Sequence, residues 1–295
     1  MVLFVTFILS GLTLGVGTML APALPTRQPR IAVSAVFVLA LILSGAVFLG
    51  ALFGWDTLVI DYMWFSMIIG VFLGGTLTIG MSRIEEALAH GENADTGWPG
   101  PRTLAAFLTW FMVVLLIVNT LPTPSTYQNL PSTVDFKASN VGATVLLTYF
   151  DSQLTANSNQ VYRGMLTLMV LLLIWLLYDF SNELDAHETI SWGLTLVAPA
   201  LLIGFDLALI LASLFSLGFG FFALRWVQAG YRFEALAASI CGAAAILSNP
   251  YAGGVMASGY LLLGVVTPVR RWLWGLVSIS LLVVLGLLPW LVANG

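Results

Sequence analysis

The sequence contains very few charged residues. Only 8% of its 295 residues are Asp, Glu, Lys or Arg, whereas an ordinary soluble domain has about 25%. Hydrophobic residues make up 59%, and the mean hydropathy is +0.99. A water-soluble fold of this length cannot bury so much apolar surface. The composition therefore excludes a disordered protein, a nucleic-acid-binding protein and a cytosolic enzyme.

Cysteine and histidine are also scarce. The single cysteine, Cys241, lies in an apolar run, so we interpret it as a packing residue that forms no internal disulfide. The two histidines, His90 and His187, lie in polar segments without a second His or Cys at metal-ligand spacing. Phosphate-binding glycine loops and nucleophile elbows are missing too. The sequence predicts no metal site, no cofactor and no catalytic residue.

Long apolar runs account for most of the chain. A membrane-spanning helix needs about 20 mostly apolar residues, and hydropathy predicts ten spans. Their approximate ranges are 2–20, 31–54, 62–81, 103–120, 164–180, 190–205, 207–225, 235–249, 253–267 and 272–292. Eight or nine spans plus a re-entrant segment fit the runs 190–225 and 235–267 almost as well.

The predicted fold class is an all-α, polytopic transmembrane helical bundle in a single membrane domain, 1–295. Within it we distinguish a three-helix unit, 1–82, and a two-helix unit, 103–180, with a polar external loop, 121–163. A four- to five-helix unit, 190–295, follows. The centre of the loop, residues 140–150, is apolar and β-branched, so we expect it to pack on the membrane surface or on a partner.

Lys and Arg set the expected orientation, because they gather in cytoplasmic loops. With the N-terminus outside, only Lys137 and Arg163 fall outside. The other eight basic residues fall inside: Arg27, Arg30, Arg83, Arg102, Arg225, Arg232, Arg270 and Arg271. The prediction is a multi-pass protein of the cell membrane, inner or plasma, with both termini on the outer side.

Acidic residues in or beside apolar runs are functional candidates, because a charge at mid-bilayer costs about 3 kcal/mol on insertion scales. Asp206 lies inside a long apolar run, and it either caps the following helix or lies on an ion path. Asp56, near the external face, is either a solvated loop residue or an ion-path residue. In a further alternative, a lipid-linked glycosyltransferase, Asp56 would be the external acid.

A turn interrupts the pair of apolar runs within 235–267. It reads Asn249-Pro250-Tyr251-Ala252-Gly253-Gly254, a strong signal for a break between helices. The turn is either a plain external hairpin or, at Asn249 and Pro250, a solute site built from exposed helix ends. The second interpretation belongs to a stand-alone membrane transporter of a neutral or apolar solute.

The order of several features resembles a known family. Residues 50–56, Gly-Ala-Leu-Phe-Gly-Trp-Asp, follow an apolar span that begins after Arg30. Later, Leu121-Pro122 precedes a Pro-rich loop, then Asn140-Val141 and an apolar run. Over about residues 30–225, this order is similar to the C-terminal part of the large subunit of Mrp-type multisubunit sodium/proton antiporters. The small subunits of membrane-bound hydrogenases share it, and residues 190–295 would correspond to the family's following subunit.

The resemblance implies an integral membrane subunit whose partners are other membrane subunits, lipids, and Na⁺ or H⁺. Asp56 and Asn140, a structural loop residue, are the polar positions that match the family motifs. The family's membrane glutamate falls near Phe65, and Thr148 and Phe150 replace the Asp and Arg of its Asp-Tyr-Arg sequence. The predicted function is a non-catalytic subunit of an ion-translocating complex, mainly scaffold, with a minor ion-path role.

Overall fold

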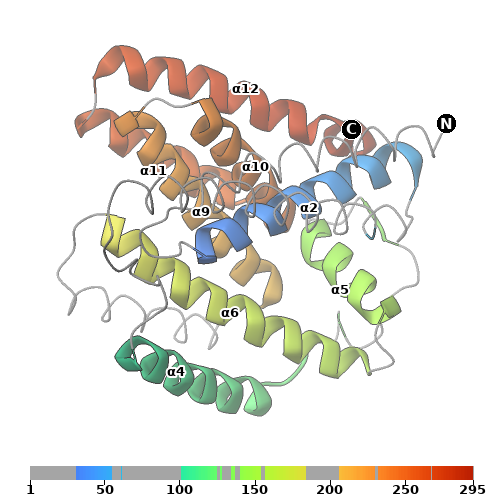
Figure 1. The fold of residues 1–295 in the computed structure, drawn as a ribbon. Helices are drawn as coiled ribbons and strands as arrows, with labels where there is room; N and C mark the ends of the chain where they lie inside the picture. Colours follow the sequence, from blue (N-terminus) through green and yellow to red (C-terminus); the bar gives the residue numbers. More distant parts are fainter. Residues whose placement is uncertain are drawn as a thin grey trace, which may run out of the picture. The chain divides into compact units, whose positions relative to one another are not determined.

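The computed structural model describes residues 31–54, 61, 101–124, 127, 134–136, 140–153, 157–183, 206–229, 232–266 and 268–294. These residues form helices, turns and short connections without a strand (Figure 1). The chain divides into two compact units, Met1–Ser34 with Asp56–Phe107, and Ala35–Trp55 with Leu108–Gly295. The second unit holds the features discussed below. The predicted all-α class is confirmed for the described part of the chain.

Eight helices lie within the described residues. They are α2 (Ile31–Phe53), α4 (Pro101–Thr120), α5 (Val141–Gln153), α6 (Ser158–Glu183), α9 (Leu207–Ala229), α10 (Arg232–Ser248), α11 (Ala252–Val266) and α12 (Val269–Asn294). Seven of them coincide with predicted spans. The predicted spans 2–20, 62–81 and 190–205, and the count of ten, lie wholly or partly outside the described residues.

Four of the described helices are long and apolar enough to cross a membrane, by length and composition. The apolar stretches are Ala35–Leu52, Ser158–Tyr178, Leu207–Gln228 and Val269–Val292. Shorter apolar stretches occur at Leu108–Thr120, Glu234–Ser248 and Ala252–Val265. Because a span needs about 20 apolar residues, the four long helices indicate a membrane protein.

Local signals explain where these helices end. Gly54, with a φ of 90°, follows α2, and this left-handed conformation suits a residue without a Cβ atom. Its N–H donates to the Gly50 carbonyl at 2.9 Å and closes the last turn. The predicted break between α10 and α11 is confirmed at residues 249–251.

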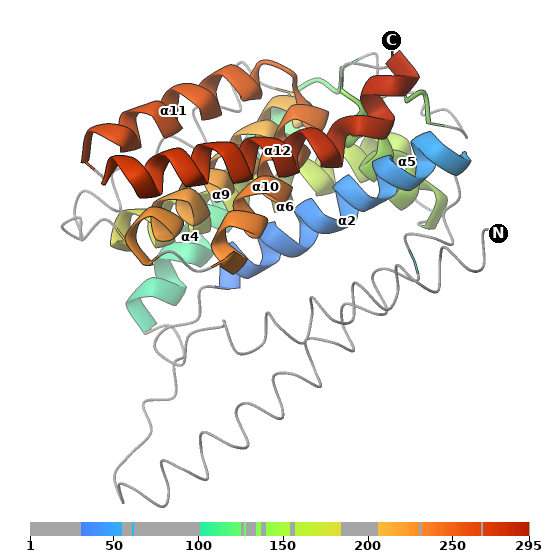
Figure 2. The same ribbon diagram turned by 90° about the horizontal axis from the view of Figure 1, so that it is seen from above.

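Helix α9 is the centre of the second unit. It packs against α10, α6, α11, α12 and α5. Close approach depends on Gly218, where a Cβ atom would lie 2.9 Å from Val36 Cγ1 and 3.4 Å from Cys241 Sγ. Cys241 is fully buried, which confirms its interpretation as a packing residue. Helices α11 and α12 lie side by side along one face (Figures 1 and 2).

The expectation for residues 140–150 is wrong. We expected this apolar stretch to pack on the membrane surface or on a partner, but it forms most of α5, which packs inside the second unit against α6, α9 and α10. Val141, Ala143 and Leu147 are fully buried. The β-branched residues that suggested a surface segment are instead held by tertiary packing, which overrides local propensity.

Candidate functional site

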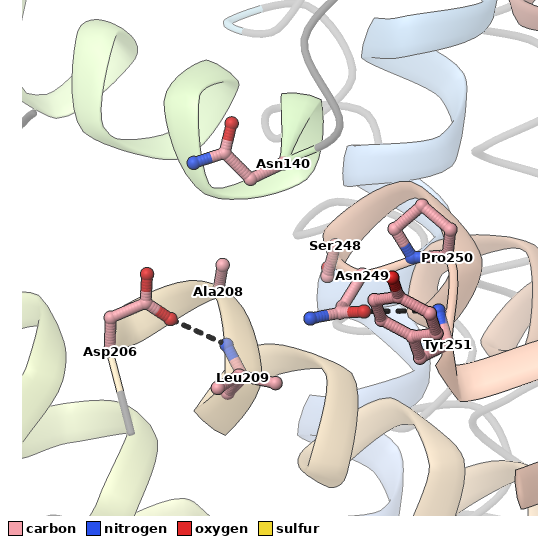
Figure 3. Close-up of a pocket in the computed structure, with 8 residues that line it drawn as sticks. All are labelled: Asn140, Asp206, Ala208, Leu209, Ser248, Asn249, Pro250 and Tyr251. Carbon is pink, nitrogen blue, oxygen red and sulfur yellow. Dashed lines mark hydrogen bonds between the residues drawn. The ribbon is translucent and has the colours of Figure 1, made fainter. Parts of the chain in front are cut away.

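A pocket of about 470 Å³ lies where three parts of the second unit meet. Asn140 reaches it from the residue before α5, and the start of α9 supplies a second wall. The turn between α10 and α11 supplies the third. The lining residues are Asn140, Asp206, Ala208, Leu209, Ser248, Asn249, Pro250 and Tyr251 (Figure 3).

Asp206 caps the start of α9. Its Oδ1 accepts a hydrogen bond from the Leu209 N–H at 3.1 Å, and its backbone carbonyl accepts from the Ile210 N–H at the same distance. An aspartate at this position satisfies donors that the first helical turn leaves unpaired. The second carboxylate oxygen points away from Leu209 (Figure 3). The cap therefore uses one oxygen and leaves the other for the pocket.

The α10–α11 turn is fixed by Asn249. Its Oδ1 accepts from the Tyr251 N–H at 3.0 Å, and its own N–H closes α10 on the Ala245 carbonyl at 2.9 Å. This is an Asx turn, and the ring of Pro250 presets the φ angle that the turn needs. With Oδ1 engaged, the amide nitrogen of Asn249 points into the pocket from the wall opposite Asp206 (Figure 3).

Asn140 is anchored by a buried tyrosine. Its Nδ2 donates to the Tyr127 hydroxyl at 3.0 Å, and the Tyr127 ring stacks on Tyr162 with centroids 5.2 Å apart. Tyr127 is buried, and this burial, together with the nearby Asp206 carboxylate, raises its pKa above the ordinary value for tyrosine. Its hydroxyl thus stays protonated around neutral pH and holds the Asn140 side chain without adding charge to the pocket.

The structure brings together four of the five predicted site residues. Asn140, Asp206, Asn249 and Pro250 came from separate arguments in the sequence, yet all four line one pocket. Asp56, the fifth, lies outside the described residues. The glycosyltransferase alternative depended on Asp56, so it gains no support from the pocket.

Sequence reasoning missed two contributors. Tyr251, which is 86% exposed, lines the pocket beside Pro250. Tyr127 anchors Asn140 from loop 121–163, and no spacing in that loop indicates this contact. Tyr251 could have been found, because it directly follows the Asn-Pro pair of the turn.

One buried acid lies outside the pocket. Glu234, in the first turn of α10, is buried, and its Oε2 has no hydrogen-bond partner among the described residues. It does not line the pocket, which lies beyond the opposite end of the same helix.

The described residues of the pocket can hold a polar ligand, but they include no metal-type ligand set. Within the described part of the chain, no group of three His, Cys, Asp or Glu residues could hold a metal ion. Asp206 gives the pocket one negative charge, and two carboxamides give it neutral polar groups. No family model, curated protein or solved structure matches this chain.

Proposed function

We propose that this chain is a non-catalytic integral membrane subunit of a multisubunit ion-translocating complex, mainly scaffold, with a minor ion-path role at the pocket. The observation that carries the proposal is that Asp206 and Asn140 line one pocket. Asp206 is the acid in a long apolar run, and Asn140 is a position shared with the antiporter subunits that the sequence resembles. A carboxylate beside an amide can attract and orient a cation.

Sparse charge within the spans supports a scaffold role. The four long apolar stretches carry few ionisable groups, Arg163 in α6, Arg225 in α9 and Arg270 and Arg271 in α12, all near helix ends. Proton relays and ion pathways use acids, bases or histidines within the membrane. The described spans lack such a chain of groups, which fits a subunit that is mainly scaffold.

The distribution of charge supports an orientation. Arg271 donates to the carbonyls of Val227 and Gln228 at 2.9 and 2.8 Å, at the end of α9. Asp206 lies at the start of the same helix, about 35 Å away at 1.5 Å per residue. Because basic residues favour the cytoplasmic side, the pocket faces the outside of the cell membrane in this proposal. Ten spans with both termini outside remain part of it.

A specific observation favours a second candidate. Asn249, Pro250 and Tyr251 form one wall of the pocket, and all three are uncharged. A stand-alone transporter of a neutral solute would bind its substrate at such a broken helix pair. In that case the chain would function without partner subunits.

Purification separates the two candidates. The tagged chain is extracted from its native membrane in mild detergent, and its native mass and copurifying chains are determined. An unrelated polytopic protein, tagged and extracted in the same way, is the control. Stoichiometric antiporter-like membrane chains support the subunit proposal. A lone, monodisperse chain contradicts it and favours the stand-alone transporter.

A further inference from the structure

The charge of the pocket limits what it can hold. Among the described residues that line it, Asp206 is the one carboxylic acid, and none is Lys, Arg or His. The neighbouring Tyr127 hydroxyl stays neutral, because burial raises its pKa. A ligand that matches this wall carries a positive charge, since a carboxylate with one oxygen still free to accept attracts a cation in a partly enclosed site.

The remaining hydrogen-bonding groups specify the kind of cation. Asn140 uses Nδ2 on Tyr127, and Asp206 uses Oδ1 on Leu209. Among the described residues, Asn140 Oδ1 and Asp206 Oδ2 have no partner, so both can accept. Asn249 engages its Oδ1, which leaves its amide N–H groups as donors. The two acceptors on Asn140 and Asp206 and the donor on Asn249 fit a ligand with an ammonium group and, a few bonds away, an oxygen that accepts. The Tyr251 hydroxyl, which also lines the pocket, can donate or accept.

The size of the pocket favours an organic cation over a bare ion. Its volume of about 470 Å³ falls in the range of small-molecule sites, roughly 300–1,000 Å³. A single water occupies only about 30 Å³ in the liquid, and a dehydrated sodium ion is smaller still. The walls also lie on three separate elements, and a small organic molecule can contact several of them at once.

We infer that this pocket binds a primary ammonium group of a small organic molecule, with the ammonium between Asp206 and Asn140 and an oxygen of the ligand accepting from Asn249. The inference rests on the proposed role of the pocket as a cation site. Because the pocket lies at helix ends, the ammonium can come from a free amine or from the headgroup of an ethanolamine phospholipid.

The free-amine arm uses ethanolamine and the purified chain. Binding is measured by saturation-transfer NMR, with tetramethylammonium, which has no N–H donor, as the matched probe. We expect ethanolamine to bind and tetramethylammonium to bind at least about tenfold more weakly, a difference of about 1.4 kcal/mol. Equal binding of the two probes overturns the inference.

Two pocket variants and one control test the residues. Asp206→Asn keeps a capping side chain but removes the charge, so ethanolamine affinity should fall about tenfold or more. Asn140→Asp adds a second carboxylate, so the affinity for ethanolamine should rise. Misfolding would lower the affinity and cannot produce this rise. Asp151→Asn makes the same charge change in the last turn of α5, outside the pocket lining, and should leave affinity unchanged. Unchanged affinity in both pocket variants overturns the inference.

The lipid arm uses native mass spectrometry of the chain from equal mixtures of ethanolamine and choline phospholipids. Preferential retention of the ethanolamine lipid, lost in Asp206→Asn, identifies the headgroup as the source. Binding of free ethanolamine without lipid preference identifies a soluble amine. Binding in neither arm overturns the inference. Since both arms use the isolated chain, this failure is distinct from the absence of copurifying subunits, which contradicts only the proposed complex.

Discussion

At the residue scale, the two oxygens of Asp206 have different surroundings. Oδ1 accepts the hydrogen bond that caps α9, and the second oxygen is left for the pocket. The sequence posed these as alternatives, a cap or an ion-path residue. The structure confirms the cap, and the pocket geometry keeps the second role as a proposal. One residue can serve both because a carboxylate accepts several hydrogen bonds.

Substitutions at Asp206 separate the cap from the charge. Asp206→Ala removes the capping acceptor and should lower the free energy of unfolding by about 1 kcal/mol. Asp206→Asn keeps an equally good cap, so its stability should stay within a few tenths of a kcal/mol of wild type. Thermal unfolding in detergent, followed by far-UV circular dichroism, measures both. Equal losses in the two variants would show that charge, and not capping, stabilises α9.

At the element scale, the position of α5 determines the shape of the pocket. Its first turn packs against the end of α10 at Gly142, where a Cβ atom would lie 2.8 Å from Ser248 Oγ and 3.2 Å from Ser248 Cα. Ser248 lines the pocket, and Asn140 precedes the same turn of α5. A side chain at residue 142 would therefore move two walls of the pocket apart.

Gly142→Ala should destabilise the protein by about 1–3 kcal/mol, because overpacking forces the backbone of α10 to shift. Gly164→Ala is the matched control, since no atom lies within 4 Å of a Cβ built there. This exposed helical position should gain up to about 1 kcal/mol, as alanine favours helix over glycine. Unfolding of both variants in the same detergent gives the comparison. A Gly142→Ala variant with the stability of the wild type would contradict the close packing of α5 on α10.

At the scale of the whole molecule, the two ends of α9 lie beside polar groups of different charge. Asp206, Asn140 and the turn at Asn249 gather at one end, and Arg225 and Arg271 lie toward the other. In a membrane, such an asymmetry sets which end faces the cytoplasm. The proposed orientation therefore predicts different chemical accessibility for the two ends in intact cells.

Cysteine labelling tests this orientation. The wild-type chain has only Cys241, which is fully buried, so it should not react with a membrane-impermeant maleimide. Tyr251→Cys, at an exposed position beside the pocket, should be labelled in intact cells. Gln228→Cys, at the exposed end of α9, should be labelled only after permeabilisation. The reverse pattern would place the pocket on the cytoplasmic side and contradict the orientation.

The sequence by itself determined the features that arise within a few residues. Apolar run length predicted seven of the eight described helices, the Asn249-Pro250 pair predicted the break between α10 and α11, and Asp206 before an apolar run predicted a cap. Hydrophobicity, turn chemistry and capping act locally, so one chain segment carries each signal.

Only the tertiary structure decided which of these segments meet. Asn140, Asp206 and Asn249 are far apart in the chain, and no local pattern says that they line one pocket. The burial of α5 and the support of Asn140 by Tyr127 likewise depend on packing between distant segments. In a chain that is apolar almost throughout, hydrophobic pattern does not distinguish lipid-facing from protein-facing surface. Close packing at small residues such as Gly142 makes that choice.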